Sequence, residues 1–188
     1  MERVKNLLNI SADLKKTVAD TLSSEILNAA QKIKSCLDAG GKLLLMGNGG
    51  SAGDAQHIAA ELTGRFYLDR EPLDAEALHV NTSYLTAVAN DYGYDQVYDR
   101  LVRAKGRAGD VLIAISTSGN SKNILLAAEA AKSIGMAVVG MTGKSGGHLN
   151  AVCDVLINVP DNDTPRIQEC HIMIGHILCE FVEKALAE

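Results

Sequence analysis

The hydrophobic positions divide the chain into short apolar runs and longer stretches whose apolar residues recur three or four positions apart. Five runs have the length of a strand and lie at 42–46, 77–80, 111–115, 136–141 and 155–159. Helical periodicity lies between them, most clearly at 121–134. Continuous apolar strands that alternate with helices are typical of a parallel sheet covered on both faces. The pattern predicts an α/β protein, a three-layer αβα sandwich with a five-stranded parallel sheet.

Two long terminal helices are expected beside this sheet. Apolar residues keep a helical period from 11 to about 39, where two glycines end the pattern, and this stretch predicts one long helix or two. The tail 164–188 is predicted to be one helix, opened by Thr164 and Pro165 in cap and first-turn positions. Its apolar side is wide, so we expect it to contact another subunit as well as the sheet.

Composition and charge narrow the class of protein. With 188 residues the chain has the size of one domain. A net charge of −5 and an aromatic content of 4% disfavour nucleic-acid binding through a basic surface or through base stacking. No window approaches the roughly 18 uncharged apolar residues of a membrane span, and charges interrupt the N-terminus where a signal peptide needs an apolar run. We therefore expect no membrane partner and a cytoplasmic location.

Four cysteines and one histidine lie in stretches that look like core. Cys36, Cys153, Cys170 and Cys179 show no CxxC spacing, so reduced, buried thiols are expected, with the C-terminal pair as alternative metal ligands. His171 is expected to be a core histidine.

Two loops could hold a phosphate, because ligands of parallel α/β sheets bind at the carboxyl ends of the strands. The first, 47–52, matches GxGxxA, but the next strand lacks the acidic end that a dinucleotide site needs. The second, 116–121, places four hydroxyls and a glycine before a helix N-terminus, where free N–H groups and the helix dipole favour a phosphate. One serine is expected to cap that helix. No P-loop lysine follows the glycine, so the loop fits a sugar-phosphate site better than a site for nucleotide hydrolysis.

Four polar residues on two helices are candidates for the chemistry. His57 and Glu61 lie four positions apart, so their side chains share a helix face and can bind one metal ion or one substrate; a plain surface contact is the alternative. Gln168 and His176 lie eight positions apart, roughly 12 Å along a helix. One small site cannot easily take both from one chain. The spacing therefore predicts a symmetric oligomer with sites at subunit interfaces.

Four stretches together resemble the SIS (sugar isomerase) fold and, within it, the phosphoheptose isomerases. They are GNGGSAGDAQHIAAELTGRF (47–66), TAVANDYGY (86–94), GDVLIAISTSGNS (109–121) and TPRIQECHIMIGH (164–176). They are spread over most of the chain and are jointly far more specific than either phosphate loop. The resemblance implies a single SIS domain over 1–188 and a homotetramer, with the helical region 1–40 at the interface.

The same resemblance implies the site residues. The implied substrate-binding set is Asn48, Gly49, Gly50, Ser51, Glu61, Asn90, Asp91, Ser116, Thr117, Ser118, Ser121 and Gln168. The implied ligands of one zinc ion per subunit are His57, Glu61, Gln168 and His176. Asn90 and Asp91 would contact sugar hydroxyls, and the hydroxyls of 116–121 would hold the phosphate of a sugar-phosphate substrate.

The implied reaction converts D-sedoheptulose 7-phosphate to D-glycero-D-manno-heptose 7-phosphate through an enediol, the first step of ADP- or GDP-heptose biosynthesis. Glu61 would carry a proton between C1 and C2, and His176 would serve as the acid for the neighbouring oxygen. Zinc would polarise the carbonyl or orient the hydroxyls. A residue bound tightly to zinc is a weaker proton carrier, so either the ligation is loose during turnover or the metal mainly positions the substrate.

Three alternatives remain. A non-catalytic SIS protein that binds the bacterial replication initiator would look similar around 86–121, but intact Glu61 and His176 favour the enzyme. A sugar-phosphate-sensing regulatory domain would need a DNA-binding module, for which the chain shows no basic helix–turn–helix segment. Another SIS isomerase, acting on a hexose or arabinose phosphate, would be less expected to carry all four zinc-ligand positions.

Overall fold

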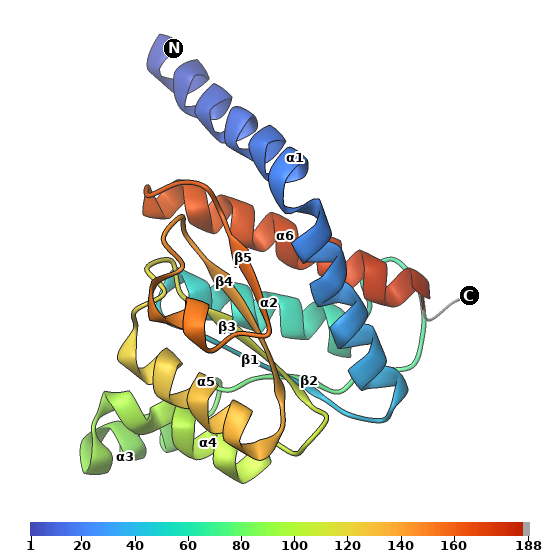
Figure 1. Cartoon of the computed structure of the whole chain (residues 1–188), viewed down its shortest axis with the longest axis vertical. Coiled ribbons are helices and arrows are strands. Elements are labelled where there is room, and N and C mark those ends of the chain that lie inside the picture. Colours follow the sequence, from blue (N-terminus) through green and yellow to red (C-terminus); the bar gives the residue numbers. More distant parts are fainter. Residues whose placement is uncertain (186–188) are drawn as a thin grey trace.

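A five-stranded sheet forms the centre of the molecule (Figure 1). The computed structural model describes residues 1–185. The strands are β1 (Leu43–Gly47), β2 (Ala75–Ala77), β3 (Val111–Ile115), β4 (Ala137–Thr142) and β5 (Val155–Asn158). They are all parallel, in the order β2-β1-β3-β4-β5. The prediction of a five-stranded parallel sheet is confirmed.

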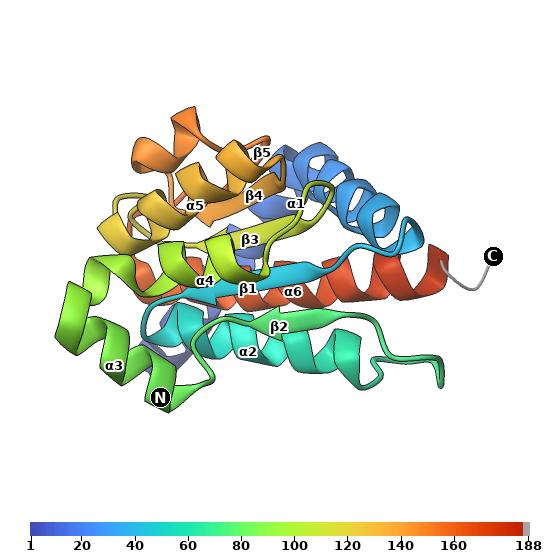
Figure 2. The same cartoon turned by 90° about the horizontal axis from the view of Figure 1, so that it is seen from below.

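Helices cover both faces of this sheet, as Figure 2 shows from a second direction. One face carries α1 (Glu2–Asp38), α2 (Gly50–Thr63) and α6 (Thr164–Ala185). The other carries α3 (Thr82–Tyr92), α4 (Val97–Lys105) and α5 (Lys122–Ile134). Two short 3-10 helices are η1 (Tyr94–Gln96) and η2 (Gly147–Ala151). The three-layer αβα sandwich is thus confirmed, as are the long terminal helices.

The alternation of side chains along the strands supplies both cores. In β1, Leu43 and Leu45 pack under the first helical layer, and Leu44 and Met46 pack under the second. Successive side chains of a strand point to opposite faces, so a strand that is apolar throughout is buried on both sides. This is why the apolar runs, which do not alternate with polar residues, identified the strands.

Two predicted elements differ from the structure by more than one residue at a boundary. The first helix is one continuous helix that begins at Glu2, well before position 11. The strand predicted at 77–80 is wrong, because β2 spans Ala75–Ala77 at the edge of the sheet and pairs only with β1. Val80 lies beyond it with 47% of its surface exposed. The predicted C-terminal helix is present as α6, and positions 186–188 of that prediction lie outside the described residues.

The strand order places the two candidate loops next to each other. The chain leaves β1 toward β2 on one side, whereas β3 leads to β4 on the other. The loops that follow β1 and β3 therefore meet at the carboxyl edge, at the point where the strand order reverses. Ligands of open α/β sheets bind at this topological switch point.

The cysteines are all free thiols. Cys36, Cys170 and Cys179 are buried and Cys153 is half-buried, which confirms the expectation for three of them. Burial raises the pKa of Cys153 and Cys179 to about 12, so these thiols are protonated at neutral pH. Within residues 1–185, neither Cys170 nor Cys179 belongs to a group of three side chains that could hold a metal ion. Among the residues that the structure describes, no helix is both long and apolar enough to cross a membrane.

His171 is fully buried on α6, as predicted for a core histidine. Its Nε2–H donates to the carbonyl of Thr142 over 3.1 Å, while Nδ1 has no hydrogen-bond partner within residues 1–185. Burial lowers the pKa of His171 to about 4, despite the hydrogen bond to Thr142, which raises it. The folded protein therefore holds this imidazole neutral.

We expect the free energy of unfolding to fall as the pH decreases from 6.5 toward 4, because the unfolded chain protonates His171 in this window and the folded chain does not. The stability that neutral His171 preserves is fully present above pH 6.5. Its loss at lower pH amounts at most to roughly 3 kcal/mol. Urea denaturation of wild type and His171→Leu at several pH values across this window measures it. The variant should lose less stability than wild type; an equal loss in both would contradict the prediction.

Candidate active site

Glycines let the first loop turn tightly between β1 and α2. Gly49 has a φ of +57°, which L side chains rarely adopt, and α2 begins at the next residue. A Cβ on Gly50 would lie 2.7 Å from Nε2 of Gln168, so the Gln168 amide occupies the space beside this glycine. Ser51 is buried behind the turn. Tyr98, buried between the helical layer and the sheet, donates its hydroxyl to the carbonyl of Gly47 and fixes the end of β1.

A pair of amides joins the first loop to the first turn of α5, directly after the second loop. Asn48 Nδ2 donates to Asn123 Oδ1 over 3.0 Å, and Asn123 Nδ2 donates back to Asn48 Oδ1 over 2.9 Å. The hydroxyl of Tyr94 also donates to Asn48 Oδ1, over 3.1 Å. The Asn48 side chain, predicted as part of a substrate cradle, thus fixes the first loop against the start of α5.

The second loop presents hydroxyls at the start of α5. Ser121 is the N-cap residue of α5 but makes no side-chain cap hydrogen bond, so the prediction that a serine hydroxyl caps this helix is wrong. Its hydroxyl lies 3.1 Å from that of Ser116 at the end of β3, and this pairing takes it away from the helix N–H groups. Thr117 is half-buried and Ser118 exposed. The N–H groups that begin α5 therefore remain without a side-chain cap from Ser121.

A polar cavity of about 230 Å³ adjoins this loop. It is lined by Thr117, Ser118, Asn120, Lys144, Ser145, Asp161, Asn162, Thr164 and Ile167. Lys144 is the cation of this lining and was not among the predicted site residues. The signal for it in the sequence was weak, because a single lysine after a strand is common on protein surfaces.

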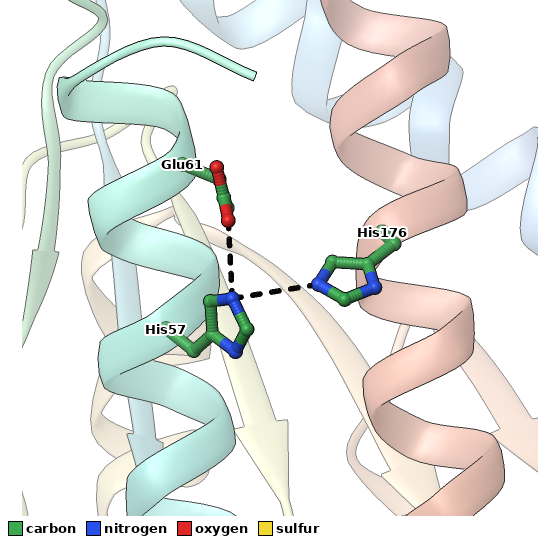
Figure 3. Close-up of side chains that lie close together, drawn as sticks. All are labelled: His57, Glu61 and His176. Atoms are coloured by element: carbon green, nitrogen blue, oxygen red, sulfur yellow. Dashed lines mark hydrogen bonds and ion pairs between the residues drawn. The ribbon is translucent and has the colours of Figure 1, made fainter. Parts of the chain in front are cut away.

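The catalytic candidates converge from two helices. His57 and Glu61 project from α2, and His176 projects toward them from α6 (Figure 3). Nε2 of His57 lies 3.0 Å from Glu61 Oε1 and 3.5 Å from His176 Nε2. The His57 side chain is 48% exposed and that of Glu61 25%, so a substrate can reach both. The i, i+4 pair is therefore more than a surface contact, because a third group from another helix completes it.

This donor set fits a metal ion. One ligand atom from each of the three residues lies within 4.8 Å of the others. Two imidazoles and one carboxylate form a typical catalytic zinc set with an open position. Ligand atoms around tetrahedral zinc lie about 3.3 Å apart, which is close to the distances of 3.0 and 3.5 Å found here.

A neighbouring carboxylate lies close to this cluster. Asp54 is one turn before His57 on α2, and its Oδ2 is buried with no hydrogen-bond partner among the described residues. Burial raises the pKa of Asp54, and the electrostatic interaction with His57 lowers it by a smaller amount.

Several predicted site residues lie outside the cluster. The Gln168 amide lies beside Gly50, about two turns of α6 away from His176, and so away from the point where the three side chains converge. Asn90 and Asp91 are exposed at the end of α3 and hydrogen-bond to each other over 2.9 Å. Within residues 1–185, neither makes a hydrogen bond to the two loops.

Close contact between α2 and α6 depends on a glycine that the sequence reasoning missed. A Cβ on Gly175 would lie 2.5 Å from Cδ1 and 2.7 Å from Cγ1 of Ile58. Ile58 is 1% exposed and has little room to move. Gly175 therefore lets the two helices approach until His176 reaches His57. The only sign of this role in the sequence is that a glycine interrupts an apolar helical pattern.

Gly175→Ala is expected to weaken metal binding about tenfold or more, because the added methyl group separates the helices that carry the ligands. Alanine is also the better helix former, so weaker binding would not be a helix-propensity effect. Competition with a chelator measures the affinity. The matched control is Gly53→Ala on α2, where an added Cβ meets nothing within 4 Å. Equal affinities of wild type and Gly175→Ala would contradict the packing argument.

Known proteins share this architecture. The sequence matches the family described as SIS domain over residues 8–143, most of the chain, so the fold and its two switch-point loops are those of an SIS-domain protein. Phosphoheptose isomerase of Rhodospirillum rubrum is 56% identical over 161 residues, or 86% of each chain. Phosphoheptose isomerase of Geobacter sp. (strain M21) is 48% identical and covers 99% of this chain and 97% of its own. The chain belongs to the phosphoheptose isomerase family.

A solved structure supports this assignment. Phosphoheptose isomerase GmhA from Neisseria gonorrhoeae has a TM-score of 0.92 and 46% identity to this chain, and the match covers 97% of this chain and 98% of that one. The predicted resemblance to the SIS fold and to this family is therefore confirmed along nearly the whole chain.

Proposed function

We propose that this protein is an aldose–ketose isomerase that converts D-sedoheptulose 7-phosphate to D-glycero-D-manno-heptose 7-phosphate, the first step of ADP- or GDP-heptose biosynthesis. The observation that carries the proposal is the convergence of Glu61, His57 and His176 within 4.8 Å in a chain of this family. Its relatives are named phosphoheptose isomerases. The alternative of a non-catalytic protein that binds the replication initiator is not supported.

The phosphate of the substrate would bind at the second loop. Ser116, Thr117, Ser118 and Ser121 lie on the segment that leads into the N-terminus of α5, where the helix dipole adds attraction for an anion. Residues 48–51 of the first loop lie beside the start of α5, because Asn48 pairs with Asn123. We place the sugar chain along this loop, with Asn90 and Asp91 on its hydroxyls and Gln168 beside Gly50.

The proton transfers would belong to Glu61 and His176. In the ketose, C1 carries two hydrogens and C2 carries the carbonyl. Glu61 would take a proton from C1 while His176 donates one to the oxygen on C2, which gives a cis-enediol. Glu61 would then return its proton to C2, and the hydroxyl on C1 would lose its proton to His176 as the aldehyde forms. His57 lies 3.0 Å from Glu61 and orients the carboxylate.

We also propose one zinc ion per subunit, held by His57, Glu61 and His176, with Gln168 of a neighbouring subunit as the fourth ligand. When bound, the zinc would polarise the carbonyl and orient the neighbouring hydroxyls. Support comes from the spacing of the three ligand atoms and from the distance along α6 that separates Gln168 from its own His176.

A homotetramer is the proposed assembly, with residues 1–40 at the interface. The start of α1 extends beyond the rest of the domain (Figure 1) and exposes four apolar side chains. They are Val4, Leu7, Leu8 and Ile10. An apolar cavity of about 390 Å³ lies between α1 and α6, lined by Lys15, Val18, Ala19, Ser23, Ile26, Leu27, Met173, Ile177 and Phe181. A second copy of the chain would cover this surface.

Shared sites predict complementation between two inactive variants. Glu61→Gln and Gln168→Ala subunits, mixed and reassembled, should regain activity, because some sites of the hybrid combine an intact Glu61 with an intact Gln168. Activity of the mixture against that of each variant alone is the measurement. Hybrids verified by mass spectrometry that stay inactive would show that each chain completes its own site.

The purified protein with sedoheptulose 7-phosphate tests the function directly. We expect NMR to show conversion to the aldose phosphate, and absence of conversion would reject the proposal. A second sample, stripped of metal by a chelator, separates the two roles of zinc: activity that survives chelation would restrict the metal to an accessory part. We place the reaction in the cytoplasm, where the four free thiols would stay reduced.

A further inference from the structure

A buried carboxylate on α6 binds the loop that follows α2. The Glu183 side chain is 0% exposed, and it accepts hydrogen bonds from the backbone N–H groups of Phe66, Tyr67 and Leu68 over 3.1, 2.6 and 3.0 Å. Arg70 Nε lies 3.2 Å from the same carboxylate. Burial raises the pKa of Glu183, but the N–H donors and Arg70 outweigh it and hold the pKa below its usual range. The carboxylate is therefore ionised and neutralised in place.

Arg70 extends this contact to the end of α2. Its guanidinium donates to the carbonyl of Leu62 over 2.8 Å and to that of Glu61 over 3.1 Å. These are carbonyls of the last turn of α2, which have no partner within the helix. Glu183 and Arg70 thus connect α6 to the helical turn that carries the proposed proton carrier.

Phe66 extends the contact to the other catalytic candidate. Its ring stacks on that of His176, with centroids 5.7 Å apart and an angle of 27° between the planes. The His57 ring also contacts His176, edge-on, at 5.0 Å. Glu183 lies seven residues after His176, about two turns along the same helix. The His176 ring therefore packs against a loop whose backbone is held by Glu183.

We propose that Glu183 is a positioning residue of the isomerase site, which acts by fixing the loop 66–70 so that Phe66 orients His176 and Arg70 holds the turn of Glu61. This inference rests on the proposed function. Burying an ionised carboxylate is costly unless every oxygen is bonded. Here both oxygens accept hydrogen bonds from three consecutive N–H groups, and Arg70 adds an ion pair. All four groups belong to the segment that contacts the catalytic candidates.

Glu183→Gln tests the proposal, because the amide keeps the size of the side chain but turns one acceptor into a donor that faces N–H groups. We expect kcat to fall about tenfold or more while KM changes little, since a displaced acid affects the reacting state more than binding. Amide exchange at 66–68 should become faster, and the NMR signal of the His176 ring should move. The matched control is Glu180→Gln on the same helix, whose carboxylate pairs only with the exposed Lys184 among the described residues.

The outcomes separate positioning from simple stabilisation. Faster exchange at 66–68 with unchanged kcat and an unmoved His176 signal would overturn the proposal, because Glu183 would then only hold the loop. If Glu183→Gln does not fold, Phe66→Leu decides, since it removes the stacking ring and leaves the buried carboxylate bonded: the same fall in kcat supports the proposal and unchanged kcat overturns it. If the wild type does not isomerise sedoheptulose 7-phosphate, the proposed function fails, while the His176 signal still tests whether Glu183 sets the ring.

Discussion

Glu61→Gln is expected to lower kcat about a thousandfold while the protein keeps its fold, because the amide has the shape of the carboxylate but cannot carry a proton between C1 and C2. The side chain is 25% exposed, so the substitution does not disturb the core. Turnover of sedoheptulose 7-phosphate by NMR is the measurement. In D2O the wild type should incorporate deuterium at C1 of the ketose, and the variant should not.

A control for this variant comes from the other helical layer. Glu129→Gln makes the same chemical change at an exposed position of α5, and wild-type turnover is expected. Deuterium incorporation by Glu61→Gln at the wild-type rate would show that another group moves the proton, and the assignment of Glu61 would then be abandoned.

Gly119→Ala is expected to cost about 3 kcal/mol or more of unfolding free energy and to abolish phosphate binding. Gly119 has a φ of +67°, where an L side chain costs about 1–2 kcal/mol. In addition, a Cβ added at Gly119 would overlap the carbonyl oxygen of Gly146 and would lie 2.9 Å from the backbone nitrogen of Gly147. Backbone cannot move aside as a flexible side chain can, so the loop 116–121 must shift.

Urea denaturation with and without inorganic phosphate measures both effects. The matched control is Gly109→Ala, where φ is +91° but an added Cβ meets nothing within 4 Å. It should show only the cost of the backbone conformation and should keep the stabilisation by phosphate. A Gly119→Ala protein as stable as Gly109→Ala would mean that the contact with Gly146 gives way at no cost.

The net charge of −5 looked unfavourable for a phosphorylated substrate. The structure shows how the attraction for a phosphate group can arise locally, at one loop. Four hydroxyls and the N–H groups that begin α5 lie at one end of the sheet, and Lys144 lines the adjoining cavity. The field of a helix terminus acts within about one turn, so it does not depend on the charge of the whole surface.

The sequence predicted most of the fold because the strands are apolar throughout. A strand such as Val111–Ile115 must be buried on both faces, and only a sheet between two helical layers buries it. The same logic failed at 77–80, where apolar residues continue past an edge strand that pairs on one side only. Likewise, one serine of the loop 116–121 was expected to cap α5. The serine at the N-cap, Ser121, pairs with Ser116 instead, and this pairing depends on how the loop closes.

The sequence by itself determined the layers of the sheet, the two loops at its carboxyl edge and the pair His57 and Glu61, because each follows from the spacing of residues within one element. Tertiary structure decided which distant groups meet them. His176 reaches that pair because Gly175 lets α6 approach α2, and Glu183 binds a loop more than a hundred positions earlier in the chain. Such contacts depend on the packing of whole helices, which no local period encodes.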